Sequence, residues 1–524
     1  MRMDWRRPLI VLGGLAAMMC LAAMTGFAAA QGPLTPADIA SAVRDYRVAH
    51  EQPIIRELVD LLAIPNIAAD ETNIRRNAEQ LKAMLERRGM RVQFFEIPKR
   101  GPIVYAEVSA PGAVRTVLFY AHYDGQPVDP KAWTGTGPFE PGLRTNSIEG
   151  GGTLRPFPPA GTPYQDDWRI YARSSSDDKS PIVALLVAID ALAAKGIPRA
   201  VNLKVVLDSE EENGSPGLEP AINAHRDLVR GDVLITGDGP VHQSGRPLVF
   251  YGNRGVLDFN LTAYGPVRGL HSGHYGNWAP NPAMRLAQLL ASMKDPSGRV
   301  LIDGFYADVV PLTAGERAAV DAMPFNDAEL MRELQFGEAE GGGRKLAELI
   351  NEPSLNVRGL RSAYVGDESQ NVVPDRAEAS FDIRLVKNID PVRQFERVVA
   401  HILKQGYFVV RDRAPTPEER RAHPRVARLD YGGGYPATRT SMELPVSTAV
   451  AGVLDAALGG GVVKAPTLGG SVPMHVFDRL GLPVIGVPIV NYDNSQHSHN
   501  ESLRIGHFWR GIETYAALLA ALRW

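Results

Sequence analysis

Residues 202–215 read NLKVVLDSEEENGS, an apolar run that leads directly into four acidic residues and a Gly-Ser turn. The β-branched character of the run and the turn residues that follow it predict a buried strand over 202–208. Carboxylates crowded at the end of such a strand repel one another, and each costs several kcal/mol to remove from water. The stretch therefore indicates that a cation is bound at this strand end.

The segments around this strand alternate between helical and strand-like patterns. Apolar spacing predicts helices over 37–65, 72–90 and 180–196, and strands over 92–97, 103–109 and 116–124. The same pattern resumes after Pro445, with a strand over 481–490 and a closing helix over 507–523. Alternation of this kind predicts an α/β fold with a largely parallel sheet.

A segment from about 249 to 434 interrupts the alternation. It combines strands over 256–265 and 377–386 with helices over 281–293 and 390–406. A chain of 524 residues is also too long for one compact core. We therefore expect a discontinuous α/β domain and an inserted α+β domain. The boundaries that we expect are 31–250 and 435–524 for the first domain and 251–434 for the second.

Residues 1–30 have the composition of a secretory signal peptide. Arg2, Arg6 and Arg7 precede an apolar run over 8–30, which ends in three alanines before Gln31. We expect this segment to be removed and the mature protein to be periplasmic or secreted, without a membrane segment. An uncleaved membrane anchor is the alternative, because the run is just long enough to span a bilayer.

Charge and cysteine content exclude several classes of protein. The net charge is −3 with basic and acidic residues interspersed, which argues against nucleic-acid binding. The hydrophobic content of 44% and the charged content of 22% are typical of a globular protein. Cys20 is the only cysteine and lies in the signal segment, so the mature protein would have no thiol. Any metal must then be held by histidines and carboxylates.

Acidic and imidazole side chains follow several of the expected strands, at the end where open α/β sheets bind ligands. Each has a structural explanation by itself, since an Asp before a helix is often an N-cap and a Glu in a turn is usually solvated. Five such positions, each ending an apolar run, are hard to explain as independent coincidences. Carboxylates together with two imidazoles favour a zinc site. The residues are His122, Asp124, Asp177, Asp178, Glu211, Glu212, Asp238 and His497.

Several motifs together resemble the di-zinc metallopeptidase family that includes aminoacylases, carnosinases, glutamate carboxypeptidases and acetylornithine deacetylases. The resemblance covers nearly all of the chain after about Ala49. It implies a phosphorylase/hydrolase-like catalytic domain with a mixed, largely parallel sheet, and an inserted α+β, ferredoxin-like domain that acts as a lid or dimerisation domain. The motifs are YAHYDGQPVDPKAW at 120–133, YARSSSDDKS at 171–180, EEENGS at 210–215, HSGHYGNWAPNP at 271–282, QNVVP at 370–374, DIRL at 382–385, GGSVP at 469–473 and HSHNE at 497–501.

The resemblance implies two Zn²⁺ ions per chain, with Co²⁺ or Mn²⁺ as alternatives. His122 and Glu212 would be terminal ligands on opposite ions, and Asp177 would bridge the two. Asp238 would complete the first site and His497 the second.

The same resemblance implies the catalytic roles. Asp124 would orient the ring of His122, and Glu211 would be the general base that activates a metal-bridging water. His271 would come from a partner subunit to stabilise the oxyanion, which implies a homodimer. The peptide bond between Asp177 and the next residue would be cis.

For the substrate, the resemblance assigns a carboxylate clamp to Asn371 and Arg384, since a guanidinium binds a carboxylate in two places. Ser471 and Gly470 would line the same pocket. Carnosinase-like members carry a charged pair before GGS, and its acidic member helps to bind the free amine of the substrate. This chain has Thr467 and Leu468 at those two positions. The residues Ser174 and Ser180 stand where the family commonly has glycine.

Because Leu468 cannot hold an ammonium group, an apolar or N-acylated amino-side half of the substrate fits the chain. The function that we predict is an exported di-zinc hydrolase that cleaves a peptide or amide bond beside a free carboxylate, as dipeptidases and carboxypeptidases do. Its substrate would be a small peptide or an N-acyl amino acid. The alternatives are an N-acyl-amino-acid amidohydrolase, a catalytically inactive metal- or peptide-binding relative, and a metal-buffering or structural site.

Overall fold

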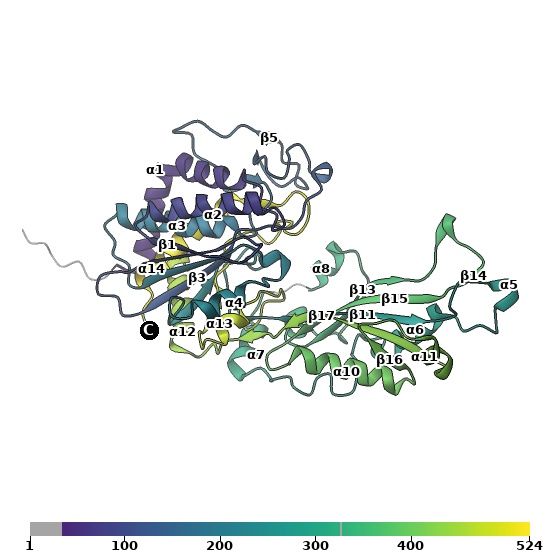
Figure 1. Cartoon of the computed structure of the whole chain (residues 1–524). Coiled ribbons are helices and arrows are strands. Elements are labelled where there is room, and N and C mark those ends of the chain that lie inside the picture. The colour runs from purple at the N-terminus through teal and green to yellow at the C-terminus, as the bar shows by residue number, and fades with distance from the viewer. Residues whose placement is uncertain (1–33, 325–326) are drawn as a thin grey trace, which may run out of the picture.

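The computed structural model describes residues 34–324 and 327–524, and these form two lobes (Figure 1). The expected signal peptide over 1–30 lies outside the described residues. Within the described ranges, no helix is both long enough and apolar enough to cross a membrane.

An eight-stranded sheet forms the centre of the first lobe, with the order β1-β2-β7-β3-β8-β20-β9-β19. The middle strands β7, β3, β8 and β20 run parallel, whereas β1 and β2 are antiparallel additions at one edge. The sheet is therefore mixed with a parallel centre, which confirms the predicted fold class. The strands are β1 (Arg91–Phe95), β2 (Ile103–Val108), β3 (Thr116–His122), β7 (Asn202–Asp208), β8 (Val233–Thr236), β9 (Leu248–Phe250), β19 (Val463–Ala465) and β20 (Val484–Gly486).

Helices cover both faces of this sheet. In Figure 1, α1, α2 and α3 lie on one face, and α4 and α13 lie on the other. Helix α3 is apolar on nearly every side because it is enclosed by α1, α14 and the sheet. The helices of this lobe are α1 (Pro36–Leu62), α2 (Glu71–Glu86), α3 (Lys179–Ala194), α4 (Leu218–Ala224), α12 (Pro445–Leu458), α13 (His475–Asp478) and α14 (Ile505–Ala521).

A second, four-stranded sheet lies beside the catalytic core, in the order β21-β6-β4-β5. In this sheet β21, near the C-terminus, pairs with β6, which lies shortly before α3. Two segments far apart in the sequence therefore lie side by side. The strands are β4 (Gly142–Arg144), β5 (Leu154–Arg155), β6 (Arg169–Tyr171) and β21 (Ser502–Arg504).

The second lobe is an antiparallel sheet with one parallel edge, in the order β13-β15-β11-β17-β16. Helices α6 and α10 pack on it, and the chain order β11-α6-β13-β15-α10-β16 is the ferredoxin-like succession that was expected. The difference is an additional strand, β17, which lies between β11 and β16. The elements are β11 (Gly255–Tyr264), α6 (Pro282–Met293), β13 (Ser354–Arg361), β15 (Arg376–Leu385), α10 (Pro391–Lys404), β16 (Phe408–Arg411) and β17 (Val426–Tyr435).

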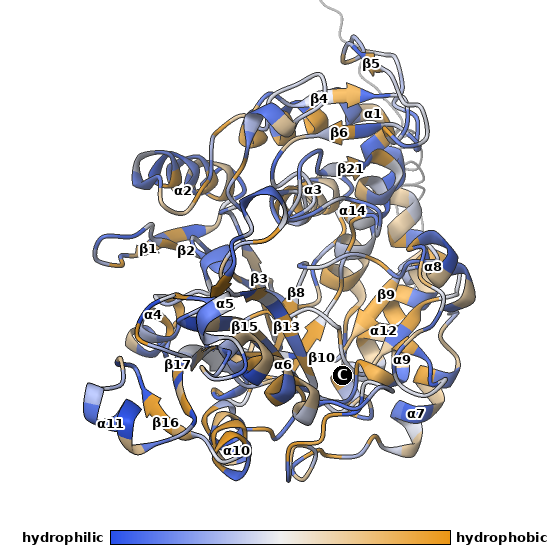
Figure 2. Cartoon of the chain, turned by 90° about the vertical axis from the view of Figure 1, so that its right-hand side faces the viewer, coloured by the Kyte–Doolittle hydropathy of each residue, from blue (hydrophilic) through white to orange (hydrophobic). Residues whose placement is uncertain are grey.

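The chain passes between the lobes at two short paired strands, β10 (Gly252–Asn253) and β18 (Thr438–Arg439). Strand β17 ends at Tyr435, one residue beyond the expected end of the inserted domain. Figure 2 shows the strands β8 and β9 of the eight-stranded sheet as hydrophobic and the outer helix α11 (Pro417–Ala422) as hydrophilic. Each lobe has its own buried apolar cluster, because the helices and the sheet of each lobe pack around a separate core.

Candidate metal centre and active site

Asp177 lies between two histidines that come from opposite ends of the catalytic domain. Its Oδ1 is 2.9 Å from Nε2 of His122, which ends β3. Its Oδ2 is 3.1 Å from Nε2 of His497, and the same nitrogen is 3.1 Å from Oε2 of Glu212. The loops after β3, β7 and β8 meet here because these parallel strands carry their ends to one edge of the sheet. Asp177 comes from the loop after β6 of the second sheet.

The structure brings all five residues expected as ligands together. Their ligand atoms form two groups, and within each group all atoms lie within 4.8 Å of one another. His122 and Asp238 share one group, whereas Asp177, Glu212 and His497 form the other. Glu211 belongs to the first group, so its carboxylate reaches the same space.

The electrostatics of this cluster fit a pair of cations. Burial, together with the charge of the neighbouring Asp177 carboxylate, raises the pKa of Asp238 to about 7. Burial also holds the pKa of Glu211 well above its usual value. The buried Oδ1 of Asp178 has no hydrogen-bond partner among the described residues. Carboxylates outnumber histidines in the cluster, and divalent cations held by His and carboxylate donors would neutralise this excess.

The same excess of negative charge raises the pKa of both histidines. Hydrogen bonds to Asp177 and Glu212 raise the pKa of His497 to about 11. For His122, burial alone lowers the pKa, but the carboxylates of Asp124 and Asp177 outweigh it and the net shift is upward. In both cases the carboxylates favour a positive charge beside the imidazole ring, which is the place a metal ion would take.

Asp124 orients the neighbouring groups. One of its carboxylate oxygens is 3.3 Å from Nδ1 of His122. The two oxygens also accept hydrogen bonds from the backbone N–H groups of Glu211 and Glu212, at 3.0 and 3.2 Å. This one buried side chain therefore fixes the loop after β7 relative to the end of β3.

Glu501, which the sequence-based reasoning did not select, holds the loop that carries Asp177. Its carboxylate accepts hydrogen bonds from the backbone N–H groups of Ser174, Ser176 and Asp177, at 2.8 to 2.9 Å. It also accepts one from the guanidinium of Arg173 at 2.8 Å. The signal was available, because Glu501 is the last residue of the HSHNE motif. The loop includes Ser174, whose hydroxyl accepts a hydrogen bond from Asn66.

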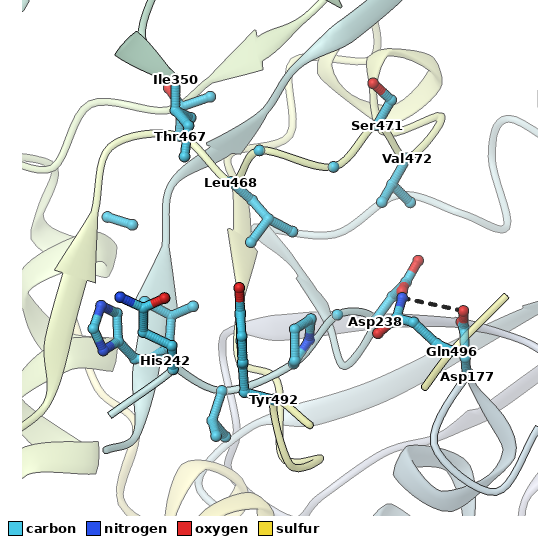
Figure 3. A pocket seen from close by; sticks show the side chains of 18 of the residues that line it. Asp177, Asp238, His242, Ile350, Thr467, Leu468, Ser471, Val472, Tyr492 and Gln496 are labelled. Atoms are coloured by element: carbon cyan, nitrogen blue, oxygen red, sulfur yellow. Dashed lines mark hydrogen bonds between the residues drawn. The ribbon is translucent and has the colours of Figure 1, made fainter. Parts of the chain in front are cut away.

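Two glutamines, also not selected from the sequence, contact the expected ligands. Nε2 of Gln496 is 3.3 Å from Oδ2 of Asp177 (Figure 3). Nε2 of Gln126 donates to Glu212 at 2.7 Å. The peptide bond between Asp177 and Asp178 is cis, as the resemblance implied.

A guanidinium and a hydroxyl lie together on the side of the site toward the lid. Arg384, near the end of β15, donates from Nη1 to Oγ of Ser471 at 2.7 Å. A second arginine, Arg254, lies near them, and its pKa is lowered to about 10 by burial and by the positive charge of Arg384. The interacting charges of the two guanidinium groups favour an anion near them, and the carboxylate of Asp382, 3.4 Å from Nε of Arg384, is one such partner in the same chain. Nothing in the sequence around Arg254 distinguished it.

His271 and Asn371 are far from this cluster within one chain. His271 ends the short strand β12 (Leu270–His271), which pairs with β14 (Val372–Val373), and the Asn371 carbonyl accepts a hydrogen bond from Ser272 N–H. Figure 1 places β14 and α5 (Ser272–Tyr275) at the tip of the lid. Arg384 lies near the other end of β15, about 25 Å away along the strand. Asn371 and Arg384 therefore do not form one clamp within a single chain.

Comparison with known proteins agrees with this geometry. Residues 118–521 match the model of peptidase family M20/M25/M40, which includes every expected ligand. The chain belongs to this family. The predicted family is thereby confirmed, and the chain is a hydrolase of the peptidase type that acts on C–N bonds.

Relatives of this family member cover most of its length. A Beta-Ala-His dipeptidase of Homo sapiens is 24% identical over 518 residues, which is 93% of this chain and 93% of that protein. A Cys-Gly metallodipeptidase of Candida albicans is 28% identical over 426 residues, or 80% of this chain and 81% of that protein. The crystal structure of an M20 family metallo-carboxypeptidase from Sulfolobus solfataricus has a TM-score of 0.73 and 30% identity, covering 89% of this chain and 98% of that one.

Proposed function

We propose that this chain is an exported di-zinc dipeptidase or carboxypeptidase, which cleaves a peptide bond beside a free carboxylate. The observation that carries the proposal is the pair of ligand groups joined through Asp177, with Arg384 and Ser471 on one side. His122 and Asp238 would hold one ion, Glu212 and His497 the other. Such ions, when bound, lower the pKa of water and polarise a carbonyl group.

Glu211 is placed to move the proton. Its carboxylate lines a cavity together with Asp177 and Asp238, and burial raises its pKa toward that of an effective general base. Glu211 accepts the proton of the attacking water while the water oxygen bonds to the scissile carbonyl carbon. It then donates that proton to the amine nitrogen as the C–N bond breaks.

Arg384 would set the position of the substrate. Its guanidinium donates to Ser471, next to Gly470 in the same loop, and it has further N–H groups for a second acceptor. A carboxylate held there fixes which peptide bond reaches Glu211. The neighbouring charge of Arg254 strengthens the attraction for an anion.

The proposal includes a homodimer. His271 and Asn371 are exposed at the lid tip, far from the cluster of their own chain, which supports a role for them in the site of another subunit. His271 would then donate to the oxyanion and Asn371 to the substrate carboxylate. Exposed apolar side chains of the lid, among them Val357, Leu360 and Tyr364, support an interface on this lobe.

Export and domain roles complete the proposal. The pattern of residues 1–30 supports a signal peptide and a periplasmic or secreted mature protein. Residues 31–250 and 435–524 would form the catalytic domain, and 251–434 would form the lid and the dimer contact.

The test is the metal content of the purified mature protein, followed by release of the C-terminal amino acid from a panel of dipeptides and N-acyl amino acids. We expect close to two zinc ions per chain and turnover of the dipeptides. Bound metal without turnover across the panel would instead support a metal-buffering site. Absence of both metal and turnover would support an inactive relative.

A further inference from the structure

A cavity of about 400 Å³ opens directly beside the acidic cluster. Asp177, Glu211 and Asp238 line one end of it, and Ser471 lies on its border toward the carboxylate clamp. The rest of the wall is mainly apolar. Figure 3 shows Leu468 and Tyr492 entering the cavity from opposite sides, with Ile350 and His242 at the end away from Asp177.

The apolar wall is built by both lobes. Leu248 lies on β9, which is next to the edge strand β19 of the catalytic sheet, and Leu468 lies shortly after the end of β19. Met323 and Ile350 come from the inserted segment, just after α7 (Ala314–Asp321) and α9 (Leu346–Leu349). Leu468 and Met323 pack on an apolar cluster that includes Leu248, which holds both side chains against the wall.

The described lining of the cavity offers no carboxylate for an ammonium group apart from the metal-site cluster. Among the described residues that line it, the only carboxylates are those of the metal-site cluster, Asp177, Glu211 and Asp238. Their negative charge would already be balanced by bound cations. The position nearest the GGS loop is occupied by Leu468, which has no polar atom in its side chain.

We infer that this cavity receives a large apolar group on the amino side of the scissile bond. The inference rests on the proposed function and names its substrate class, which is carboxylate-bearing substrates whose amino-side half ends in a group of leucine or phenylalanine size. That group is either the side chain of an N-terminal amino acid or an acyl chain. Leu468, Ile350 and Met323 are then the residues that determine specificity.

The expected preference follows from the size of the wall. A methylene placed in an apolar site improves kcat/KM by about 10-fold or more, and a leucyl or phenylalanyl group has at least three more side-chain carbons than an alanyl group, so that it should exceed the alanyl group by at least about 100-fold. A charged amino-side residue such as glutamate should be the poorest substrate, because its carboxylate would be buried without a partner.

The first experiment uses the unmodified zinc-loaded enzyme and a series with alanine on the carboxylate side. The substrates are Gly-Ala, Ala-Ala, Leu-Ala, Phe-Ala and Glu-Ala, and kcat/KM is measured for each. We expect Leu-Ala and Phe-Ala to be cleaved at least about 100-fold more efficiently than Ala-Ala. If Ala-Ala or Glu-Ala is cleaved as well as Leu-Ala, the inference is wrong while the proposed function stands. If no member of the series or of its acylated counterparts is cleaved, the proposed function itself fails.

A matched pair distinguishes the two sources of the apolar group. N-(4-methylpentanoyl)-alanine has the skeleton of Leu-Ala without the amine, and N-acetyl-alanine is its small counterpart. Because the described lining of the cavity has no separate carboxylate for an ammonium group, we expect the two large substrates to be cleaved within about 10-fold of each other. If the two rates differ by more than about 10-fold, the faster substrate identifies the source of the apolar group. The inference is overturned if neither large substrate exceeds its small counterpart.

Variants then connect the preference to the wall. Leu468→Ala and Ile350→Ala should each lower the ratio of kcat/KM for Leu-Ala to that for Gly-Ala by about 10-fold. A general loss of folding or metal would leave this ratio unchanged. The control is Leu403→Ala, an exposed leucine on α10 in the other lobe, which should not alter the ratio. An unchanged ratio in both cavity variants would contradict the assignment.

Discussion

The acidic cluster of the catalytic lobe and the tip of the lid differ in how much each contains by itself. One chain supplies every expected metal ligand, Glu211 and the loops that hold them; His122, Asp177 and Asp238 are buried, Glu211 and Glu212 are half-buried, and His497 is exposed. The lid tip carries His271 and Asn371 on an exposed surface, with no catalytic group of the same chain nearby.

Ion binding and substrate recognition place different requirements on the structure. Ion binding needs several donors at fixed short distances, which a rigid sheet edge provides within one folding unit. Substrate recognition needs groups that approach after the substrate has entered, and these can come from a second lobe or a second copy. Ion binding and substrate recognition can each be tested by substitution, beginning with the largest expected effect.

Glu211→Gln separates proton transfer from ion binding. We expect kcat to fall by about 10⁴-fold, because the amide cannot accept the proton of the attacking water. Zinc measured by atomic absorption should stay near two ions per chain. Loss of one zinc in this variant would reassign Glu211 as a ligand, which its place beside His122 and Asp238 also allows.

His271→Ala tests whether the lid tip acts on another subunit. We expect a loss in kcat of about 10²–10³-fold, the usual effect of removing one oxyanion donor. When this variant is mixed and reassociated with Glu211→Gln, about one quarter of the parent activity should return, because half of the dimers then contain one intact composite site. Recovery near zero would place His271 in the site of its own chain. His423→Ala, another histidine of the lid, is the control.

Arg384→Ala tests the carboxylate clamp, which lies where the two lobes meet. We expect KM to rise by about 100-fold with a smaller change in kcat, because a charge-assisted hydrogen bond to the ground state is lost. Dipeptide amides, which lack the carboxylate, should be poor substrates for the parent and no worse for the variant. Equal cleavage of acids and amides by the parent enzyme would show that Arg384 does not bind the substrate carboxylate.

Glu501→Gln tests the support of the ion site and has the smallest expected effect. The amide retains the size of the side chain but loses the negative charge that accepts hydrogen bonds from Arg173 and three backbone N–H groups. We expect zinc affinity, measured by competition with a chelator, to fall by about 10-fold. Glu513→Gln is the matched control, since Glu513 is also buried but pairs with Arg44 away from the site. Equal loss in both variants would indicate a general effect on stability.

The catalytic fold could be predicted because its signals are local. The run before Glu211 and the run that ends at His122 each read as a buried strand that stops at a polar residue, and the structure forms β7 and β3 there. Parallel pairing of these strands then places their ends together. The additional lid strand β17 was not expected, since its pairing between β11 and β16 depends on contacts distant in sequence.

Supporting residues were harder to predict, because their partners lie far away along the chain. Glu501 contacts a loop more than 320 residues earlier, and Arg254 is recognised only by its nearness to Arg384. The apolar cavity was indicated by Leu468 alone. Its other walls, Met323 and Ile350, come from a segment with no pattern that points to a binding site.

The sequence by itself determined the order of strands and helices, the residue types at the strand ends and the family. These depend on periodicity and on short motifs, which neighbouring residues fix. Only the tertiary structure decided that Asn371 lies apart from Arg384 and that a large apolar cavity adjoins the acidic cluster. Both depend on how two lobes meet, and that is set by packing between residues hundreds of positions apart, which no local pattern encodes.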